Sequence, residues 1–142
     1  MLKGIDPLLS PDLLHILASM GHGDEIVLVD ALYPAVTNAQ RLVRLPACDL
    51  PRVARAVLSV LPLDTFIDQP MATMAMVDTP EVVPDVQQEV LELATEADRR
   101  EIGMEQVERF AFYERSRRAF AIVQTGELRP YGNVIFTKGV GF

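Results

Sequence analysis

The stretch EIVLVDA, residues 25–31, decides the fold of this chain. It is an apolar run rich in β-branched residues, with Gly23 before it and Pro34 after it. Such a run is typical of a strand that is covered on both faces. Because strands of this kind belong to sheets flanked by helices, the segment predicts an α/β fold.

The residues before this strand predict a helix. In SPDLLHILASM, residues 10–20, a serine suited to the N-cap precedes a proline at the first helical position, and apolar residues then recur at helical spacing. Gly21 ends the pattern. His22 therefore falls in the turn between the first helix and the first strand.

The rest of the chain continues this alternation. Further strands are predicted at 41–45, 71–77, 104–110, 120–125 and 133–139, and further helices at 52–61, 85–100 and 113–119. The order predicts one domain, residues 1–142, built as a three-layer α/β/α sandwich around a mainly parallel sheet. The last two strands are expected to form a hairpin, which would make the sheet mixed.

Composition narrows the classes of function. A formal net charge of −7 and a pI near 4.7 leave no basic stripe for a nucleic acid or an anionic membrane surface. Cys48 is the single cysteine, so neither a disulfide framework nor a cysteine metal site is expected. The first residues lack the long apolar run of a secretory signal, and no membrane-spanning stretch is present, which predicts a cytoplasmic protein.

Two residues around the first strand are candidates for chemistry. His22 lies between Gly21 and Gly23, which leave its ring uncrowded, and imidazole exchanges protons near neutral pH. Asp30 follows four apolar residues, and a partly buried carboxylate needs donors from backbone or ligand. The alternatives are a turn histidine bonded to backbone and a structural carboxylate.

Two further candidates lie near the end of the chain. Arg109 stands among aromatic residues close to a predicted strand end, where a guanidinium could bind hydroxyl or carboxyl groups. Tyr131-Gly132-Asn133 presents a phenol and an amide beside a glycine that permits close approach of a ligand. A solvated charge run for the arginine and ordinary turn chemistry for the triplet remain the alternatives.

Several common motifs are missing from the sequence. It contains no dinucleotide-binding glycine motif, no P-loop, no nucleophile elbow and no zinc motif. His15 and His22 are seven residues apart, which does not match the i, i+4 spacing of helical metal ligands. We therefore expect neither a metal nor a cofactor.

Three blocks together resemble the fucose mutarotase and ribose pyranase family. They are GHGDE within MGHGDEIVLVDALYPA (20–35), RFAFYER at 109–115 and YGN at 131–133, and the similarity extends from end to end with a weaker middle. The resemblance implies a sugar isomerase acting at the anomeric carbon. It also implies a homo-oligomer, since relatives form rings that are commonly decamers.

The resemblance assigns roles to the candidate residues. His22 matches the catalytic histidine, and Tyr131 is the second group that can exchange protons. Asp30, Arg109 and Tyr131-Gly132-Asn133 match the substrate-binding positions, with L-fucose or a similar monosaccharide as the substrate. Arg109 favours the fucose branch, since ribose pyranases typically have a histidine there. Leu32 departs from close fucose mutarotases, which often have a histidine at that position.

Three other functions stay open at this point. The first is a D-ribose pyranase, which interconverts pyranose and furanose forms. The second is a sugar-binding or transport-accessory protein that uses the same pocket without proton transfer. The third is a structural module that only forms oligomers.

Overall fold

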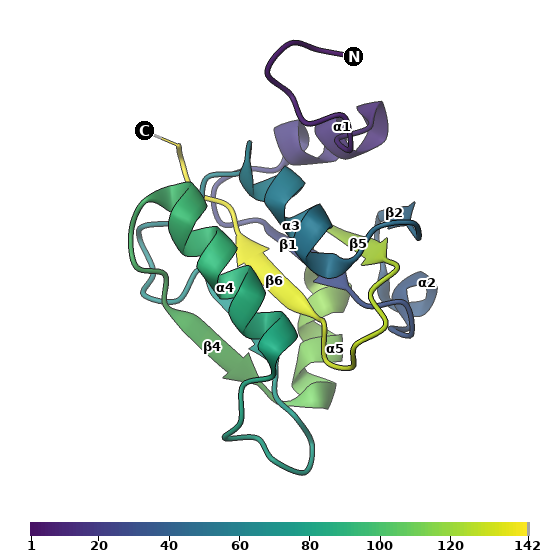
Figure 1. Ribbon diagram of the computed structural model, residues 1–142, viewed down its shortest axis with the longest axis vertical. Coiled ribbons are helices and arrows are strands. Elements are labelled where there is room, and N and C mark those ends of the chain that lie inside the picture. Colours follow the sequence, from purple (N-terminus) through teal and green to yellow (C-terminus); the bar gives the residue numbers. More distant parts are fainter. Residues whose placement is uncertain (142) are drawn as a thin grey trace.

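The computed structural model describes residues 1–141, which fold into alternating strands and helices (Figure 1). The strands are β1 (Glu25–Val29), β2 (Leu42–Leu45), β3 (Met71–Met74), β4 (Met104–Val107), β5 (Ala121–Thr125) and β6 (Val134–Thr137). The helices are α1 (Pro11–Ser19), α2 (Ala35–Asn38), α3 (Leu50–Leu58), α4 (Asp85–Asp98) and α5 (Arg109–Arg118).

The strands form one six-stranded sheet in the order β2-β5-β1-β6-β3-β4. β2, β5 and β1 are parallel to one another, and so are β3 and β4. β6 is antiparallel to both of its neighbours, β1 and β3. The carboxyl ends of the five other strands therefore line one edge of the sheet, the edge that runs across the strands. β6 begins at that same edge.

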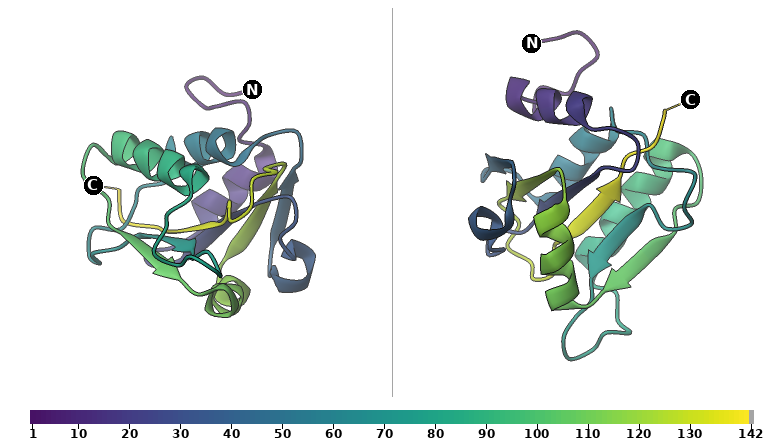
Figure 2. Two further views of the ribbon diagram at one scale, coloured as in Figure 1. Left: turned by 60° about the horizontal axis from the view of Figure 1, so that its bottom comes forward. Right: turned by 180° about the vertical axis from the view of Figure 1, so that it is seen from behind.

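Helices cover both faces of the sheet, as Figure 2 shows. On one face, Ile26 and Leu28 of β1 pack with α1, α3 and α4 in the larger core cluster. On the other face, Val27 and Val29 pack in a smaller cluster with Phe112 of α5. β1 is thus buried on both faces, as its continuous apolar sequence predicts, and the three-layer sandwich with a mainly parallel, mixed sheet is confirmed.

The predicted hairpin between the last two strands is wrong. β5 and β6 lie on opposite sides of β1, so neither pairs with the other. The sheet is mixed because β6 runs against β1 and β3. The physical reason is that β1 is a central strand, so β5 can pair with one side of it and β6 with the other. The loop 126–133 is long enough to cross the end of β1.

Other predicted boundaries shift by a few residues. The strand expected at 104–110 ends at Val107, because Glu108 caps a helix there by accepting hydrogen bonds from the amides of Phe110 (3.0 Å) and Ala111 (2.9 Å). Helix α5 accordingly begins at Arg109, four residues before the predicted start. The strand expected at 71–77 ends at Met74, and the short helix α2 was not predicted.

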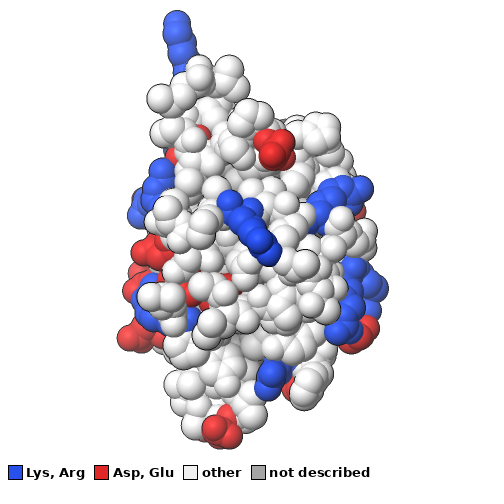
Figure 3. Space-filling model, turned by 90° about the vertical axis from the view of Figure 1, so that its right-hand side faces the viewer, with Lys and Arg blue, Asp and Glu red and all other residues white. Residues whose placement is uncertain are grey.

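The surface is unevenly charged. On the side of the molecule that carries β2 and α2, one basic side chain lies near the centre, and most other acidic and basic side chains lie toward the margins (Figure 3). Among residues 1–141, no helix combines the length and the apolar character needed to cross a membrane.

Candidate functional site

A pocket of about 250 Å³ opens at the edge of the sheet where β1 and β3 end and β6 begins. Because β6 is antiparallel to its neighbours, the residues that precede it meet the residues that follow β1 and β3. The pocket is lined by Asp30, Leu32, Tyr33, Met74, Arg109, Tyr113, Pro130, Tyr131 and Asn133.

Asp30 and Asn133 are joined at the base of this pocket. The backbone amide of Asp30 donates a hydrogen bond to Oδ1 of Asn133 over 3.0 Å, and Nδ2 of Asn133 lies 3.8 Å from the sulfur of Met74. Oδ1 of Asp30 accepts a 3.0 Å hydrogen bond from the amide of Leu32. One side chain from the start of β6 therefore ties together the ends of β1 and β3.

Burial perturbs the two titratable groups on the inner wall. Asp30 is only 7% exposed, and desolvation raises the pKa of its carboxyl group despite the hydrogen bonds that stabilise the anion. Burial also raises the pKa of Tyr33 to about 12, and its hydroxyl donates to Oγ of Ser116 over 2.7 Å. Tyr33 is thus a neutral wall of the pocket, whereas the charge of Asp30 is costly unless a ligand donates to it.

Tyr131 has an unusual backbone conformation. Its φ of +62° lies in the left-handed region, which a residue with a bulky side chain rarely adopts. Its phenolic oxygen accepts a 3.2 Å hydrogen bond from the amide of Val77, in the loop that follows β3. Strained residues of this kind concentrate at functional sites, where the surrounding structure holds them in place.

Arg109 forms the outer rim of the pocket. It is the first residue of α5, and its Nε donates to the hydroxyl of Tyr113 over 3.1 Å. Its guanidinium carbon also lies 5.6 Å from the centre of the Tyr113 ring, within the range of a cation–π contact. The remaining guanidinium nitrogens are exposed, so they are available to hydroxyl groups of a ligand.

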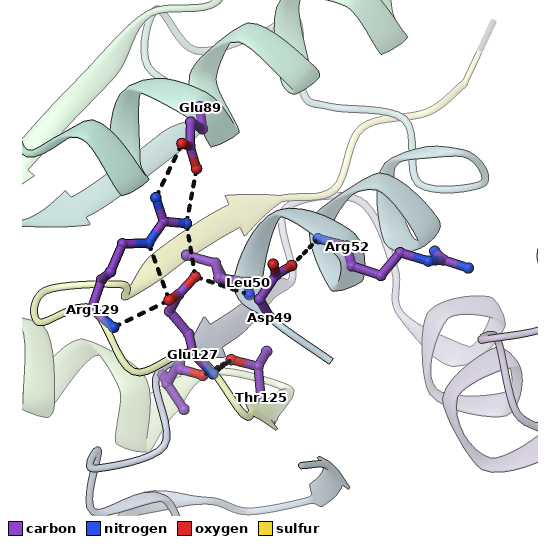
Figure 4. A network of polar contacts seen from close by, with 8 residues as sticks. Asp49, Leu50, Arg52, Glu89, Thr125, Glu127 and Arg129 are labelled. Carbon is purple, nitrogen blue, oxygen red and sulfur yellow. Dashed lines mark hydrogen bonds and ion pairs between the residues drawn. The ribbon is translucent and has the colours of Figure 1, made fainter. Parts of the chain in front are cut away.

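An ion network in which Glu127 is buried and its partners are exposed fixes the loop that carries Tyr131 (Figure 4). Glu127, at 4% exposure, accepts hydrogen bonds from the amide of Leu50 (3.3 Å) and from Nε of Arg129 (3.2 Å). Arg129 also binds Glu89 of α4 through two hydrogen bonds of 3.0 and 2.9 Å. Burial acts to raise the pKa of Glu127, but the bonds from Arg129 and Leu50 outweigh it and the pKa is lowered. The loop is therefore attached to both α3 and α4.

His22 lies at the opposite edge of the sheet from the pocket. It precedes β1, whereas Asp30 follows it, and a five-residue strand spans about 16 Å. Nε2 of His22 lies 3.0 Å from Oδ1 of Asp64, and its ring packs edge-on against Phe66 with ring centres 4.7 Å apart. Of its two flanking glycines, only Gly23 has a positive φ, +88°.

Comparisons with known proteins identify the family of the chain. Residues 3–141 match the model of the RbsD / FucU transport protein family. The chain belongs to this family.

Individual relatives are similar over nearly their whole length. An L-fucose mutarotase of Actinobacillus pleuropneumoniae is 40% identical over 140 residues, covering 99% of this chain and 97% of that protein. The crystal structure of the fucose mutarotase of Streptococcus pneumoniae in complex with L-fucose has a TM-score of 0.90 at 38% identity, covering 98% of this chain and 99% of that one. Bacillus subtilis RbsD complexed with D-ribose covers both chains fully with a TM-score of 0.77 at 22% identity, a likeness of fold alone.

The structure of this RbsD / FucU family member brings together four of the residues predicted from sequence. Asp30, Arg109, Tyr131 and Asn133 line one pocket. Gly132 does not line the pocket, and a Cβ on this residue would lie only 3.0 Å from Cγ of Glu127. Gly132 thus allows the loop to pack closely against the side chain of Glu127.

The structure also shows residues that the sequence reading missed. Asp64 is the partner of His22 and is 3% exposed. Burial acts to raise its pKa, but hydrogen bonds from the Phe66 amide and from His22 outweigh this and the pKa is lowered. Its segment, LPLD at 61–64, has the same signal as Asp30, a carboxylate after apolar residues. Nothing in the sequence marks Met74 as a pocket residue, since it belongs to a mostly apolar strand. Within residues 1–141, no three His, Cys, Asp or Glu side chains gather closely enough to share a metal ion.

Replacing Asp30 with Asn should stabilise the protein at neutral pH. The variant keeps an acceptor for the Leu32 amide but removes the buried charge. Because the pKa of Asp30 is raised in the folded state, the folded protein binds the proton more tightly, and the free energy of unfolding of the wild type falls as pH rises above the ordinary carboxyl pKa.

For Asp30→Asn we expect about 0.5–1 kcal/mol of added stability at pH 7. This advantage should shrink as the pH falls toward 4, because protonation of the wild-type carboxyl group increasingly removes the buried charge there too. Thermal unfolding of both proteins at the two pH values measures it. A lower melting temperature for Asp30→Asn at pH 7 would show that the carboxylate stabilises the fold instead.

Proposed function

We propose that this chain is an L-fucose mutarotase, an isomerase that interconverts the α and β anomers of the sugar. The observation that carries the proposal is the pocket itself, in which a carboxylate, a guanidinium, a phenol and an amide surround a space of about 250 Å³. That volume lies below the usual range for drug-sized ligands, which suits a single monosaccharide. The full-length similarity to proteins named as fucose mutarotases supports the same substrate.

The reaction needs only proton transfer. A base takes the proton of the anomeric hydroxyl while an acid gives a proton to the ring oxygen, and the bond between the anomeric carbon and the ring oxygen breaks. Rotation about the C1–C2 bond and the reverse proton transfers close the ring as the other anomer. His22 and Tyr131 are the proposed proton-transfer groups, and Asp30, Arg109 and Asn133 are proposed to hold the ring hydroxyls. General acid–base catalysis of this kind typically supplies about 10²–10⁴-fold.

Asp64 has a role in this proposal as the residue that orients His22. Its carboxylate engages Nε2 of the imidazole, so Nδ1 is the nitrogen left to face a sugar. A carboxylate partner fixes the ring orientation and stabilises the imidazolium ion that forms when the histidine accepts a proton.

The proposed site requires two copies of the chain. His22 and the pocket lie at opposite edges of the sheet, separated by the length of β1, so a sugar cannot contact both within one chain. Exposed apolar side chains accompany each part: Phe66 (73% exposed) beside His22, and Leu32 (85%) and Val77 (57%) around the pocket. A contact that joins two different surfaces of the same chain repeats head to tail and can close into a ring. We therefore propose a homo-oligomeric ring with shared sites, in keeping with the homo-oligomer that the family resemblance implies.

The function is tested by measuring exchange between the anomers of L-fucose with saturation-transfer NMR. We expect His22→Ala to fold normally and to lose the exchange, since it removes a proton-transfer group but no buried side chain. His15→Ala is the matched control, because His15 is exposed on α1 and should leave the rate unchanged. A wild-type rate in folded His22→Ala would exclude the histidine from the reaction.

Sharing of the site is tested by mixing two inactive variants. If His22 and Tyr131 of one site come from different chains, subunits refolded from an equimolar mixture of His22→Ala and Tyr131→Phe contain some sites with both wild-type residues. Random assembly should restore about a quarter of the wild-type exchange. Exchange that stays at the level of the separate variants, in a mixture shown by mass spectrometry to hold mixed oligomers, would contradict the shared site.

The preferred sugar is predicted to be L-fucose over D-ribose. The methyl group of fucose needs an apolar wall, and Tyr33, Tyr113 and Met74 line the pocket. One methyl group in such a wall is worth about 1–3 kcal/mol, so ribose should react more slowly but still measurably.

Arg109→His should reduce the preference for L-fucose, because it removes a charged donor to a hydroxyl group, worth about 1.5–3 kcal/mol. Exchange of both sugars at equal concentration measures this, and faster ribose exchange by the wild type would favour a ribose pyranase.

A further inference from the structure

Two residues other than glycine have a positive φ within residues 1–141, and only one of them has an ordinary explanation. Arg99, with a φ of +55°, is the C-cap of α4, where left-handed residues commonly end helices. Tyr131 caps no helix and lies in the loop that enters β6. A left-handed conformation in a residue of this size is unfavourable, so the surrounding structure must hold it.

The side chain of Gln87 makes the contact that holds it. Gln87 lies in the first turn of α4 and is completely buried. Its Nε2 donates two hydrogen bonds, one to the carbonyl oxygen of Tyr131 over 2.9 Å and one to the carbonyl oxygen of Met74 over 2.7 Å. Both acceptors belong to residues that line the pocket, so a single amide group ties two of its walls together.

The orientation of the Gln87 amide is itself fixed. Its Oε1 accepts a 3.0 Å hydrogen bond from Nε2 of Gln106 on β4, which also donates to Oγ1 of Thr73 over 2.8 Å. Rotating the Gln87 amide by 180° would set its oxygen against two carbonyl oxygens and its nitrogen against another nitrogen. The chain of amides therefore admits one arrangement, and every polar atom of the Gln87 side chain is paired in it.

Glu127 and Gln87 attach different parts of the same loop. The ion pair of Glu127 with Arg129 secures the first half of the loop, two or more residues away from Tyr131. Gln87 contacts Tyr131 itself, at the carbonyl group whose direction depends on the left-handed backbone. Gln87 is thus the side chain donor that acts directly on the backbone of Tyr131.

We propose that Gln87 is a positioning residue for the mutarotase reaction: it holds the backbone of Tyr131 in its left-handed conformation and so aims the phenol at the anomeric centre. This proposal rests on the proposed function. Gln87 does not line the pocket, so it acts through the two pocket residues whose carbonyl groups it holds, Tyr131 and Met74. Its loss should therefore lower the rate at saturating sugar more than it changes the sugar concentration needed for half-saturation.

The test uses the oligomeric protein with Gln87→Met, which keeps an unbranched side chain of similar length but removes both donors. We expect kcat for L-fucose exchange to fall by about tenfold or more, in keeping with the sensitivity of catalysis to small misplacements. KM should change by less than about threefold, since Asp30, Arg109 and Asn133 remain. Gln88→Met is the matched control: Gln88 is the next residue of α4, is exposed, and donates only to the carbonyl of Val83.

A spectroscopic readout follows Tyr131 independently of turnover. The sequence contains three tyrosines and no tryptophan, so labelling with 3-fluorotyrosine should give three ¹⁹F resonances, and Tyr131→Phe identifies the one from Tyr131. Gln87→Met should shift or broaden that resonance and leave those of Tyr33 and Tyr113 in place. If Gln87→Met does not fold, Gln106→Met serves instead, because it frees the Gln87 amide without removing it and should cause a smaller change of the same kind.

The outcomes separate this proposal from the proposed function. A Tyr131 resonance that stays in place in the folded variant would overturn the proposal, and so would a changed KM with unchanged kcat. If wild-type protein does not exchange the anomers of L-fucose at all, the proposed function fails, whereas a shifted Tyr131 resonance would still support the hold of Gln87 on Tyr131. A lowered kcat together with a shifted resonance supports both.

Discussion

The antiparallel pairing of β6 with β1 on one side and β3 on the other is the constraint on which the rest of the structure depends. Without β6 the sheet would consist of two parallel pieces, β2-β5-β1 and β3-β4, with no hydrogen bonds between them. Because β6 is antiparallel, its first residues lie beside the ends of β1 and β3. The same pairing that completes the sheet therefore delivers Tyr131 and Asn133 to the pocket.

The loop before β6 must be rigid if Tyr131 and Asn133 are to keep their positions in the pocket. It crosses the end of β1 and is exposed to water along part of its length, so its own contacts would leave it mobile. Glu127 and Arg129 attach its first half to α3 and α4 (Figure 4). Gln87 attaches its second half to α4. The helical layer thus fixes a segment that carries two of the proposed substrate-contacting residues.

The two edges of the sheet carry complementary parts of the proposed site. One edge holds the pocket proposed to bind the sugar hydroxyls, with the buried carboxylate of Asp30, and the other holds the paired His22 and Asp64. In the proposed mechanism neither edge is sufficient for ring opening by itself, since the pocket lacks the imidazole of His22 and His22 lies outside the pocket. Assembly of the chains would bring an acid–base pair to a bound sugar, which makes oligomerisation part of the proposed catalysis.

The sequence by itself determined the layers of the fold and four of the residues that line the pocket. EIVLVDA predicts a strand buried on both faces, and Asp30 follows from it because a carboxylate after such a strand must lie at the edge of the sheet. Only the tertiary structure decided the neighbours of β6, the left-handed backbone of Tyr131 and the pairings of His22 with Asp64 and of Gln87 with Tyr131. Hydrophobic periodicity records which faces of a segment are buried, but it does not record which segments pair. Contacts between residues more than forty positions apart depend on the register and order of strands, which are set by the packing of the whole core.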